Sequence, residues 1–364
     1  MKLLSLTKKI HASPRGGREL LSKLNQDVLA ALFGDDYIRY ELPSDHSNLW
    51  RTALNAVRGY VDGINTATIQ HTVQVIEREK VKQVFIDGSN LGGFTKALKR
   101  RLPQVETITF FHNVEVRFFW GSLLARKSMR ALAVLIANYL AERKAVRNSD
   151  TIICLSDRDS HLLKKLYGRG ATHIAPMVLE DKCPPAFAQS PDEPPEYFAL
   201  FVGGAFYANR TGISWFVREV VPWIDIPVVI VGKGFETMRV ELERPGKVTV
   251  IGEVDSLSDW YRRCQFVIAP IFDGSGMKTK VAEALMYGKK IIGTPEAFVG
   301  YEPVVEQAGA VCSTAREFIT AINGIKSSIR YSFDANLRAI YEQFYSKQAA
   351  MNRLDEIIRF KNRV

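Results

Sequence analysis

Cysteine is scarce in this sequence, and no stretch is apolar for long enough to cross a membrane. The 4 cysteines form no Cys-x-x-Cys pair, so we expect them to be reduced and structural. The longest nearly unbroken apolar run, 131–141, already contains Asn138 and Tyr139, whereas a transmembrane helix needs about 20 apolar residues. Repeats of fixed period, low-complexity tracts and residue clusters with metal-ligand spacing are also missing. These absences argue against a disulfide framework, a membrane-spanning protein, a solenoid and a metal module.

The N-terminal sequence MKLLSLTKKI also lacks the features of a signal peptide. It has basic residues on both sides of a very short apolar stretch, and no cleavage site of small residues follows. We therefore expect a mature chain that begins here and is cytoplasmic. Peripheral association with the inner face of the membrane is compatible with this expectation.

Negative charge is too scarce in the first half of the chain to balance the basic residues. Residues 1–190 carry a net charge of +10, whereas residues 191–364 are neutral overall. A basic half next to a neutral half indicates that one domain faces something anionic. Lipid, nucleic acid and a phosphorylated substrate all remain open at this point.

Length and patterning indicate two α/β domains. A single core stops growing near about 250–300 residues, and this chain has 364. The proline-rich segment 176–195 cannot continue a helix or a central strand and suits an interdomain linker. On both sides of it, short β-branched or aromatic runs alternate with stretches of helical period, which predicts parallel sheets with helical crossovers. The expected strands are 2–7, 84–87, 107–112, 151–156, 173–175, 199–203, 228–232, 248–251, 265–270 and 290–294.

The most informative motif is APIFDGSGMKTKVAEALMYGKKIIGTPEAFVG, at 269–300. A buried strand is expected to end at Pro270, and a helix to begin near Met277 after a glycine-containing loop. Backbone N–H groups at such a helix start, beside Lys278 and Lys280, suit a phosphate; a plain turn and helix cap is the alternative for the glycines alone. Glu283 falls among apolar helix residues, where a buried carboxylate is costly without partners. A ribose diol, with two donors, is a natural partner.

The stretch GSGMKTKVAEALMYGKKIIGT within this motif resembles the donor-binding signature of retaining GT-B glycosyltransferases of family 4. That family includes many bacterial capsule, lipopolysaccharide and exopolysaccharide sugar transferases. The resemblance extends to 110–119, 147–168 and 201–216. It implies an α/β GT-B fold, in which two doubly wound Rossmann-like domains face a central cleft. The expected domains are an acceptor-binding domain at 1–185, a nucleotide-sugar-binding domain at 186–340, and a C-terminal helix at 341–364 that crosses back to the first domain.

The resemblance also implies roles for individual residues of the motif. Glu283 is expected to hold the ribose of a nucleotide diphosphate sugar, and Gly276 and Met277 to lie against the sugar or the diphosphate. Ser275 stands where many relatives have a glutamate that contacts the transferred sugar. This departure leaves the identity of the donor sugar open while preserving the expected fold.

A second departure concerns the positive charge that grips the diphosphate. Many relatives place an Arg and a Lys after the strand that corresponds to 199–203, but Gly204 and Thr211 stand there in this chain. Lys278 is the residue we expect to replace that charge. Lys280 and Arg210 are the alternatives.

Glycine loops after three other expected strands are further candidates for donor contacts. Gly204, Gly232 and Lys233 follow strands of the second half, where the backbone can approach a nucleotide closely. Gly16 and Gly17 follow the first strand and open a helix, an arrangement that suits a diphosphate. Each pair of glycines can equally be a plain turn; in the resembling family, the first loop faces the donor phosphates.

His112 closes the strand expected at 107–112. A histidine at a strand end is often structural, but the resemblance implies that this one reaches the transferred sugar. Arg15 and Arg18 lie beside the first glycine loop and strengthen its expected role in binding phosphate. His112, Lys278 and Glu283 are the residues we expect to take part in catalysis.

The segment from Arg117 to Arg147 combines basic and aromatic residues with a helical apolar pattern. It is typical either of a core helix with a solvated basic face or of a surface that rests on anionic lipid. No nucleic-acid-binding motif accompanies it, so nucleic acid is not an expected partner.

These observations predict a metal-independent, retaining glycosyltransferase of hexosyltransferase type. It would move a sugar from a nucleotide diphosphate sugar, of UDP or GDP type, to a glycan or lipid-linked acceptor in bacterial surface polysaccharide synthesis. Helix-start amides and Lys278 would stabilise the leaving diphosphate, and no protein nucleophile is assigned. Two alternatives remain open: a nucleotide-sugar 2-epimerase, and a catalytically degenerate GT-B scaffold of a polysaccharide assembly complex.

Overall fold

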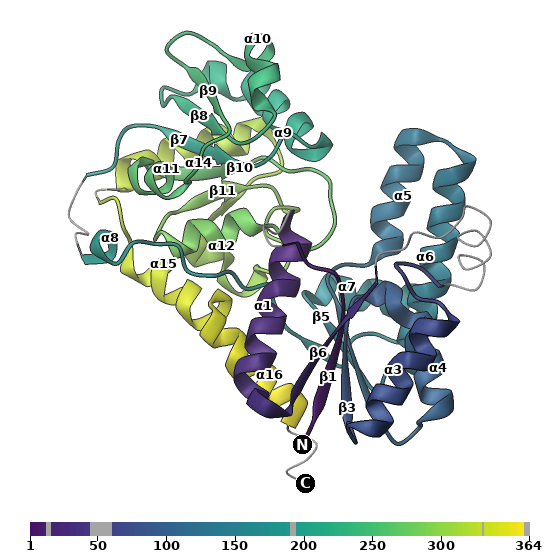
Figure 1. Cartoon of the computed structure of the whole chain (residues 1–364). Coiled ribbons are helices and arrows are strands. Elements are labelled where there is room, and N and C mark those ends of the chain that lie inside the picture. The colour runs from purple at the N-terminus through teal and green to yellow at the C-terminus, as the bar shows by residue number, and fades with distance from the viewer. Residues whose placement is uncertain (12–15, 44–59, 190–193, 330, 360–364) are drawn as a thin grey trace. The chain divides into compact units, whose positions relative to one another are not determined.

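The structure is a computed structural model that describes residues 1–11, 16–43, 60–189, 194–329 and 331–359. The chain forms two compact units, each built around its own six-stranded parallel sheet (Figure 1). Unit 1 comprises Met1–Met177 and Ala350–Val364, and unit 2 comprises Val178–Ala349. The α/β class predicted from the alternating pattern is confirmed.

The sheet of unit 1 has the strand order β2-β1-β3-β4-β5-β6. The central strands are buried along nearly their whole length, which is why they appear in the sequence as mainly apolar runs. The strands are β1 (Leu3–Lys8), β2 (Tyr37–Leu42), β3 (Gln83–Asp87), β4 (Glu106–Phe111), β5 (Thr151–Cys154) and β6 (His173–Ile174). The helices are α1 (Gly16–Phe33), α3 (Thr66–Arg78), α4 (Gly92–Arg101), α5 (Glu115–Arg126), α6 (Met129–Asn148) and α7 (Asp157–Tyr167).

Side-chain caps define where several of these helices begin. Asn65 forms a capping box with Thr68 at the start of α3, and Ser128 and Ser156 accept hydrogen bonds from the first turns of α6 and α7. Gly92 lets α4 approach α6 closely, because a Cβ there would lie 2.0 Å from the carbonyl oxygen of Ala141.

The sheet of unit 2 has the strand order β12-β11-β10-β7-β8-β9. Its strands are β7 (Ala199–Val202), β8 (Val228–Val231), β9 (Val248–Gly252), β10 (Phe266–Ala269), β11 (Ile291–Gly293) and β12 (Gly309–Val311). Its helices are α8 (Pro185–Gln189), α9 (Tyr207–Glu219), α10 (Arg239–Leu242), α11 (Ser258–Arg263), α12 (Thr279–Met286), α13 (Val305–Ala308), α14 (Ala315–Ser328) and α15 (Ala335–Ile340). An apolar core that includes Phe201, Phe216 and Phe318 packs on this sheet.

The C-terminal part of the chain continues from α15 through a π-helical turn, Tyr341–Tyr345, into α16 (Lys347–Arg359). From Ala350 onward, it belongs to unit 1. There Gln83 Nε2 donates to the carbonyl of Ile358 at 3.0 Å, and Arg359 donates to the carbonyl of Leu32 at 2.5 Å.

All ten strands expected from the sequence are present, and the structure adds β2 and β12. Both added strands are at sheet edges. Strand β2 is half-exposed over most of its length and β12 has three residues, so neither has the buried apolar run that marks a central strand. None of the helices in the described part of the chain has the length and apolar character needed to cross a membrane.

The strand orders identify the sheet edges where a ligand is expected. The order reverses between β1 and β3 in unit 1, and between β7 and β10 in unit 2. Ligands of open α/β sheets bind outside the carboxyl ends of the strands at such switch points. The loops that follow these strands therefore come first in the search for a site.

Candidate functional site

Three glycine backbones shape the switch point of unit 2. Gly203 follows β7 with φ of +151°, and Gly232 follows β8 with φ of +150°. A Cβ at Gly232 would lie 1.9 Å from the carbonyl oxygen of Gly203, so the two strand ends meet where no side chain fits. Gly204 is exposed, and its carbonyl accepts a hydrogen bond from Asn209 Nδ2 at 2.7 Å. Bare backbone is thus presented at this edge of the sheet.

Two helices begin beside these glycines, and neither has a side-chain cap. The N-cap of α9 is Phe206 and that of α12 is Lys278, and neither side chain hydrogen-bonds to the first turn of its helix. The hydroxyl of Tyr207 donates to Asp273 Oδ2 at 3.2 Å, which joins the start of α9 to the loop before α12. Two helix N-termini with backbone N–H groups to offer form a favourable position for an anion.

Lys280 places a buried ammonium group at the same position. Its Nζ donates to Asn209 Oδ1 at 3.1 Å and lies 5.5 Å from the centre of the Phe201 ring. A Cβ at Gly203 would lie only 2.8 Å from this nitrogen. Burial, with the nearby charge of Lys278, lowers the pKa of Lys280 to about 8, although Glu283 acts in the opposite direction. An incoming diphosphate would relieve the cost of this buried charge.

Lys278, which we expected to hold the diphosphate, has its ammonium group against a carboxylate. Its Nζ lies 3.0 Å from Glu296 Oε1 and donates to the carbonyl of Gly276 at 2.8 Å. A weaker contact of 3.4 Å reaches the carbonyl of Ser275. In this arrangement, Lys278 stabilises the loop. Lys280, which the sequence offered as an alternative, is the lysine whose ammonium group donates to a neutral amide, that of Asn209.

Met277 and Gly276 also stabilise the conformation of this loop. The Met277 side chain is buried against Gly300, where a Cβ would lie 2.5 Å from its Cγ. Gly276 has a φ of +64°, which few residues other than glycine adopt. Any contact of these two residues with a ligand would therefore be made by the backbone.

Glu283 is half-buried on α12, and Tyr261 orients its carboxylate. The Tyr261 hydroxyl donates to Glu283 Oε2 at 2.8 Å. Tyr261 is itself held by stacking on Tyr287, with ring centres 4.9 Å apart and planes at 1°. The sequence predicted a carboxylate that needs partners, and the structure supplies Tyr261 as one of them.

Two other cations near this edge are exposed. Lys233 lies 2.9 Å from Glu253 Oε1, and its side chain is 77% exposed, so this ion pair is of the surface type. Arg210 is exposed on the first turn of α9.

In unit 1, His112 belongs to a buried polar network at the switch point. Its Nε2 lies 2.9 Å from Asp87 Oδ1 and 3.4 Å from the Ser22 hydroxyl. Asn25 and Thr7 donate to the same carboxylate at 3.4 and 3.1 Å. His112 Nδ1 is buried and has no hydrogen-bond partner within the described residues. Burial alone would raise the pKa of Asp87, but His112 and the hydrogen-bond donors lower it to about 2.

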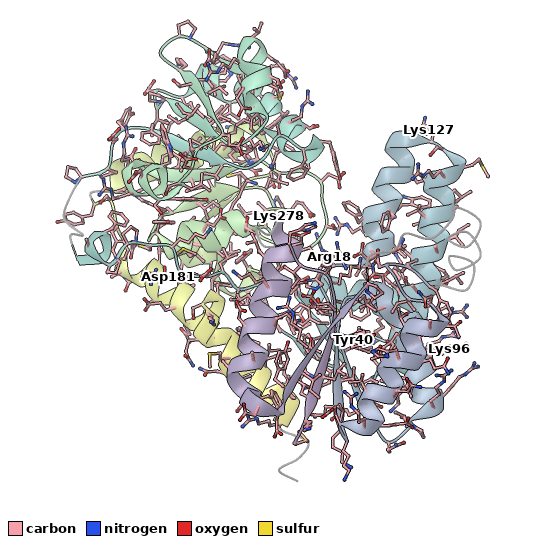
Figure 2. All side chains as sticks on the ribbon, viewed as in Figure 1. Arg18, Tyr40, Lys96, Lys127, Asp181 and Lys278 are labelled. Carbon is pink, nitrogen blue, oxygen red and sulfur yellow. The ribbon has the colours of Figure 1, made fainter. Side chains whose placement is uncertain are left out.

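The glycine loop of unit 1 opens α1 at Gly16, followed by Gly17, while Arg15 lies outside the described residues. Arg18 on the first turn of α1 reaches across the edge of the sheet (Figure 2). Its guanidinium contacts Asn90 Oδ1 at 3.5 Å and Glu115 Oε1 at 3.7 Å. The arginine is thus placed near the loops that follow β3 and β4.

Glu142 holds the helix that follows His112. Its two carboxylate oxygens accept the backbone N–H groups of Glu115 and Val116 at 2.8 and 3.2 Å, and Tyr167 donates at 2.9 Å. Burial and the neighbouring charge of Glu115 raise the pKa of Glu142 to about 7. A carboxylate inside α6 thereby caps the start of α5.

The structure gathers the sequence-predicted residues into two groups. Gly204, Gly232, Gly276 and Lys278 surround the switch point of unit 2, with Glu283 on the following helix, whereas Gly16, Gly17 and His112 lie in unit 1. Sequence reasoning missed Asp87, Asn209 and Tyr261. An acid between a buried strand and a glycine was a usable signal for Asp87. Asn209 and Tyr261 could not be found in this way, because their partners lie 71 and 22 positions away in the sequence.

Comparison with known proteins agrees with this architecture. Residues 196–327 match the family described as "Glycosyl transferases group 1". This stretch, just over a third of the chain, is a glycosyltransferase group 1 domain, and it contains the whole switch point of unit 2. No curated protein sequence matches the chain.

Solved glycosyltransferase structures resemble nearly the whole chain. A sucrose-phosphate synthase from Thermosynechococcus elongatus is 14% identical, with a TM-score of 0.69 over 99% of this chain and 98% of that one. Anabaena HepE, solved in complex with UDP, is 13% identical, with a TM-score of 0.67 over 98% and 99%. The lipopolysaccharide outer core galactosyltransferase WaaB is 12% identical, with a TM-score of 0.64 over 99% of both chains. The chain therefore has the GT-B fold of two doubly wound Rossmann-like domains, as predicted.

Proposed function

We propose that this protein is a glycosyltransferase that takes a nucleotide diphosphate sugar as donor and binds it at the switch point of unit 2. The observation that carries the proposal is the meeting of two uncapped helix starts with the buried ammonium of Lys280. Such a position suits a diphosphate, and it lies inside the glycosyltransferase group 1 domain. HepE, of similar fold, was solved with UDP, which supports uridine as the base, with GDP as the alternative.

In this proposal, the diphosphate lies against the N–H groups of α9 and α12. Lys280 supplies the main positive charge, and Lys278 supports the loop while remaining close enough to contribute. Because backbone dipoles and ammonium groups stabilise the leaving diphosphate, we propose that no metal ion is required. Each well-placed donor of this kind contributes about 3–4 kcal/mol to the transition state.

Glu283 would accept hydrogen bonds from the ribose hydroxyls. Its Oε2 already accepts from Tyr261, which fixes the orientation of the carboxylate toward a diol. The backbones at Gly204, Gly232 and Gly276 would approach the nucleotide, with Lys233 at the exposed rim. Ser275 replaces an acidic side chain near the sugar and therefore leaves the choice of sugar to other contacts.

Unit 1 would bind the acceptor and contribute His112 to the transferred sugar. Asp87 holds Nε2, so Nδ1 is the ring nitrogen left for a sugar hydroxyl. The glycines at 16 and 17 would face the donor phosphates. Transfer with retention would let the leaving phosphate take the acceptor proton, and no protein nucleophile is proposed.

The acceptor is proposed to be a glycan or a lipid-linked glycan of a bacterial surface polysaccharide. Two features of the first half of the chain support an activity at the inner face of the membrane. Residues 1–190 hold the entire net positive charge of the chain, and α5 and α6 expose Trp120, Leu124 and Met129. Cations beside exposed aromatic and apolar side chains suit an anionic lipid surface.

The test is a thermal-shift screen with UDP, GDP, ADP, CMP and dTDP, first with EDTA and then with magnesium. A ligand at about 100 times its dissociation constant adds about 2.7 kcal/mol of stability, which raises the melting temperature by several degrees. We expect UDP to stabilise the wild type and the control Glu306→Gln, on the surface of α13, without metal. Glu283→Gln should remain folded and lose most of the shift.

Transfer assays complete the test. Release of UDP from UDP-sugars in the presence of acceptor should occur in the wild type and Glu306→Gln but not in Glu283→Gln. Stabilisation by no nucleotide would contradict the donor site and favour a scaffold protein. Conversion of the sugar without transfer would instead identify an epimerase.

A further inference from the structure

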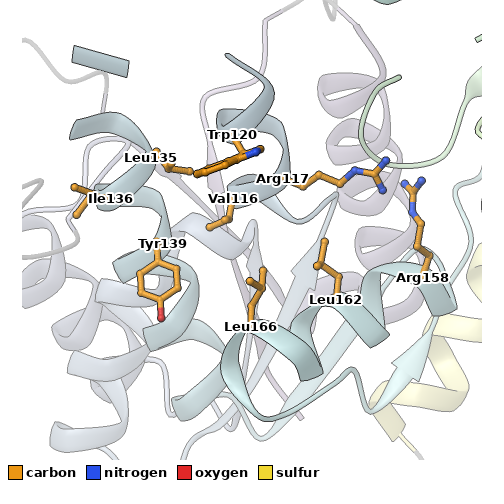
Figure 3. Close-up of a pocket in the computed structure, with 9 residues that line it drawn as sticks. All are labelled: Val116, Arg117, Trp120, Leu135, Ile136, Tyr139, Arg158, Leu162 and Leu166. Carbon is orange, nitrogen blue, oxygen red and sulfur yellow. The ribbon is translucent and has the colours of Figure 1, made fainter. Parts of the chain in front are cut away.

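An apolar pocket of about 640 Å³ lies in unit 1 between α5, α6 and α7, apart from the switch point (Figure 3). Its volume falls in the range of about 300–1,000 Å³ that is usual for small-molecule sites. Its walls are almost wholly aliphatic or aromatic and include Val116, Trp120, Leu135, Tyr139, Leu162 and Leu166. Hydrocarbon is the chemistry that this interior accommodates.

Two arginines mark one end of the pocket. Arg117 comes from α5 and Arg158 from α7, and their guanidinium groups point toward one another beside the apolar wall (Figure 3). Arg158 also lies beside the buried carboxylate of Asp159, with Nε 3.7 Å from Oδ1. Paired guanidinium groups are well suited to a phosphate, which each can contact with two N–H groups.

The rim of the pocket continues into the exposed apolar surface of the same helices. Trp120 and Ile136 line the pocket while remaining 55% and 50% exposed, and Leu124 extends the apolar strip along α5. A ligand whose hydrocarbon chain is longer than the pocket could therefore extend out of it along these exposed apolar side chains. A ligand with a hydrocarbon chain and one anionic end matches the interior, the arginines and the rim together.

We propose that this pocket binds a lipid phosphate: a single long apolar chain that ends in a phosphate or diphosphate. The chain would occupy the pocket, and Arg117 and Arg158 would hold the phosphate. This inference rests on the proposed function and narrows it, since the acceptor glycan would then be carried on a lipid phosphate. A helix of a partner protein is the competing occupant, but the two guanidinium groups at the end of an apolar hollow favour the anionic amphiphile.

Isothermal titration with decyl phosphate below its micellar concentration tests the pocket on the full-length protein. Decyl maltoside provides the same chain with a neutral head, and inorganic phosphate provides the head without the chain. We expect decyl phosphate to bind about tenfold more tightly than decyl maltoside. Inorganic phosphate should not compete at equal concentration.

Variants locate the two halves of the ligand. Arg117→Gln and Arg158→Gln should each weaken decyl phosphate about tenfold and leave decyl maltoside unchanged. Leu162→Trp fills the pocket, and Ile136→Glu places a carboxylate at its exposed rim, so both should reduce binding of both amphiphiles. Matched controls on α6 are Arg147→Gln and Val134→Glu, which do not line the pocket and should bind like the wild type.

Several outcomes would overturn the proposal. Equal affinity for decyl phosphate and decyl maltoside would show that the arginines do not hold the phosphate. Unchanged binding in folded Ile136→Glu would show that the ligand binds outside the pocket. A protein partner that protects α5 to α7 from exchange, with no decyl phosphate binding, would assign the surface to protein docking. The UDP thermal shift on the same samples separates the two proposals: its loss contradicts the donor site alone, and loss of decyl phosphate binding contradicts the pocket alone.

Discussion

In the proposed function, the single residue Lys280 prepares the site for an anion. An ammonium group in an apolar interior is costly, and here its hydrogen-bond partner is the neutral side chain of Asn209. Lys278, two positions earlier, has Glu296 at 3.0 Å and so carries a compensated charge. Glu283 offsets part of the cost of the charge on Lys280, but burial dominates and keeps the pKa lowered. We interpret the remaining cost as a preparation for negative charge from a ligand.

The lowered pKa of Lys280 predicts that the protein takes up a proton when it binds UDP. The pKa of Lys280 is lowered to about 8 in the free protein, and a bound diphosphate should raise it. Affinity should therefore be highest below pH 8 and fall as the pH rises through 8, since the neutral amine must first take up a proton. Calorimetry in buffers of different ionisation enthalpy at pH 8 measures that uptake.

Two variants provide the controls for this measurement. Lys280→Met should bind UDP at least about tenfold more weakly and take up no proton. Lys290→Met, which removes a lysine that donates to the carbonyl of Gln307, should behave like the wild type. Unchanged proton uptake in Lys280→Met would assign the titration to another group.

His112 and Asp87 form a second pair of residues that is held in place before a ligand binds. Asp87 lies at the end of β3, and its carboxylate is held by partners on β1, on α1 and directly after β4. Its low pKa keeps it ionised across the physiological range. The imidazole is thus oriented before any ligand arrives, which suits a contact that must be made repeatedly and in one geometry.

At the scale of elements, the ends of β7 and β8 depend on glycine for contact between backbones. Gly232 has φ of +150°, and a Cβ there would lie 1.9 Å from a neighbouring backbone oxygen. Because the carbonyl oxygen of Gly203 belongs to the backbone and cannot rotate away, a side chain at position 232 would force the two strand ends to separate. The loops that form the proposed donor site would separate with them.

Gly232→Ala should therefore destabilise unit 2 by about 3 kcal/mol or more and abolish the UDP-induced thermal shift. Gly246→Ala is the matched control, because Gly246 also has positive φ, +69°, but a Cβ there has nothing within 4 Å. It should cost about 1 kcal/mol through backbone strain alone. Calorimetric melting of both variants, with and without UDP, measures the contrast. Equal destabilisation would show that strain, and not the contact between strands, governs this edge.

At the scale of the whole molecule, charge is distributed in a way that predicts where the protein works. Residues 1–190 carry the whole net charge of +10. Lys127 lies between α5 and α6 (Figure 2), and Met129 and Arg130 begin α6. Met129 is 80% exposed, which is unusual for an apolar side chain of that size. Cations and an exposed methionine at a helical turn favour contact with anionic lipid headgroups.

The protein should sediment with vesicles that contain phosphatidylserine or phosphatidylglycerol but not with neutral phosphatidylcholine vesicles. Each cation near the surface contributes about 1 kcal/mol, so Lys127→Glu with Arg130→Glu should reduce the bound fraction severalfold. Binding should also fall between 0.05 and roughly 0.5 M salt as charge is screened. The control is Lys164→Glu with Lys165→Glu, which changes the net charge equally on α7. An equal loss in the control would mean that total charge, not the α5–α6 turn, directs the protein to lipid.

Much of this architecture was predictable because buried parallel strands have to be apolar along their whole length. The strands that were missed, β2 and β12, lie at edges, where one side needs no neighbour and the apolar run is short. Glu283 was identifiable as a carboxylate in an apolar helix. Lys280 was identifiable as one of two lysines, at positions 278 and 280, at the start of that helix. Choosing between Lys278 and Lys280 required Glu296, 18 positions from the first lysine.

The sequence alone determined two α/β units, the glycine-containing loop before α12 and the uneven distribution of charge, because composition and periodicity are local properties of a chain. Only the tertiary structure decided that Lys278 pairs directly with Glu296, that Asp87 holds His112, and that arginines from α5 and α7 line the same apolar pocket. These facts depend on residues far apart in the chain, and a contact between such residues exists only after the sheets and helices have packed.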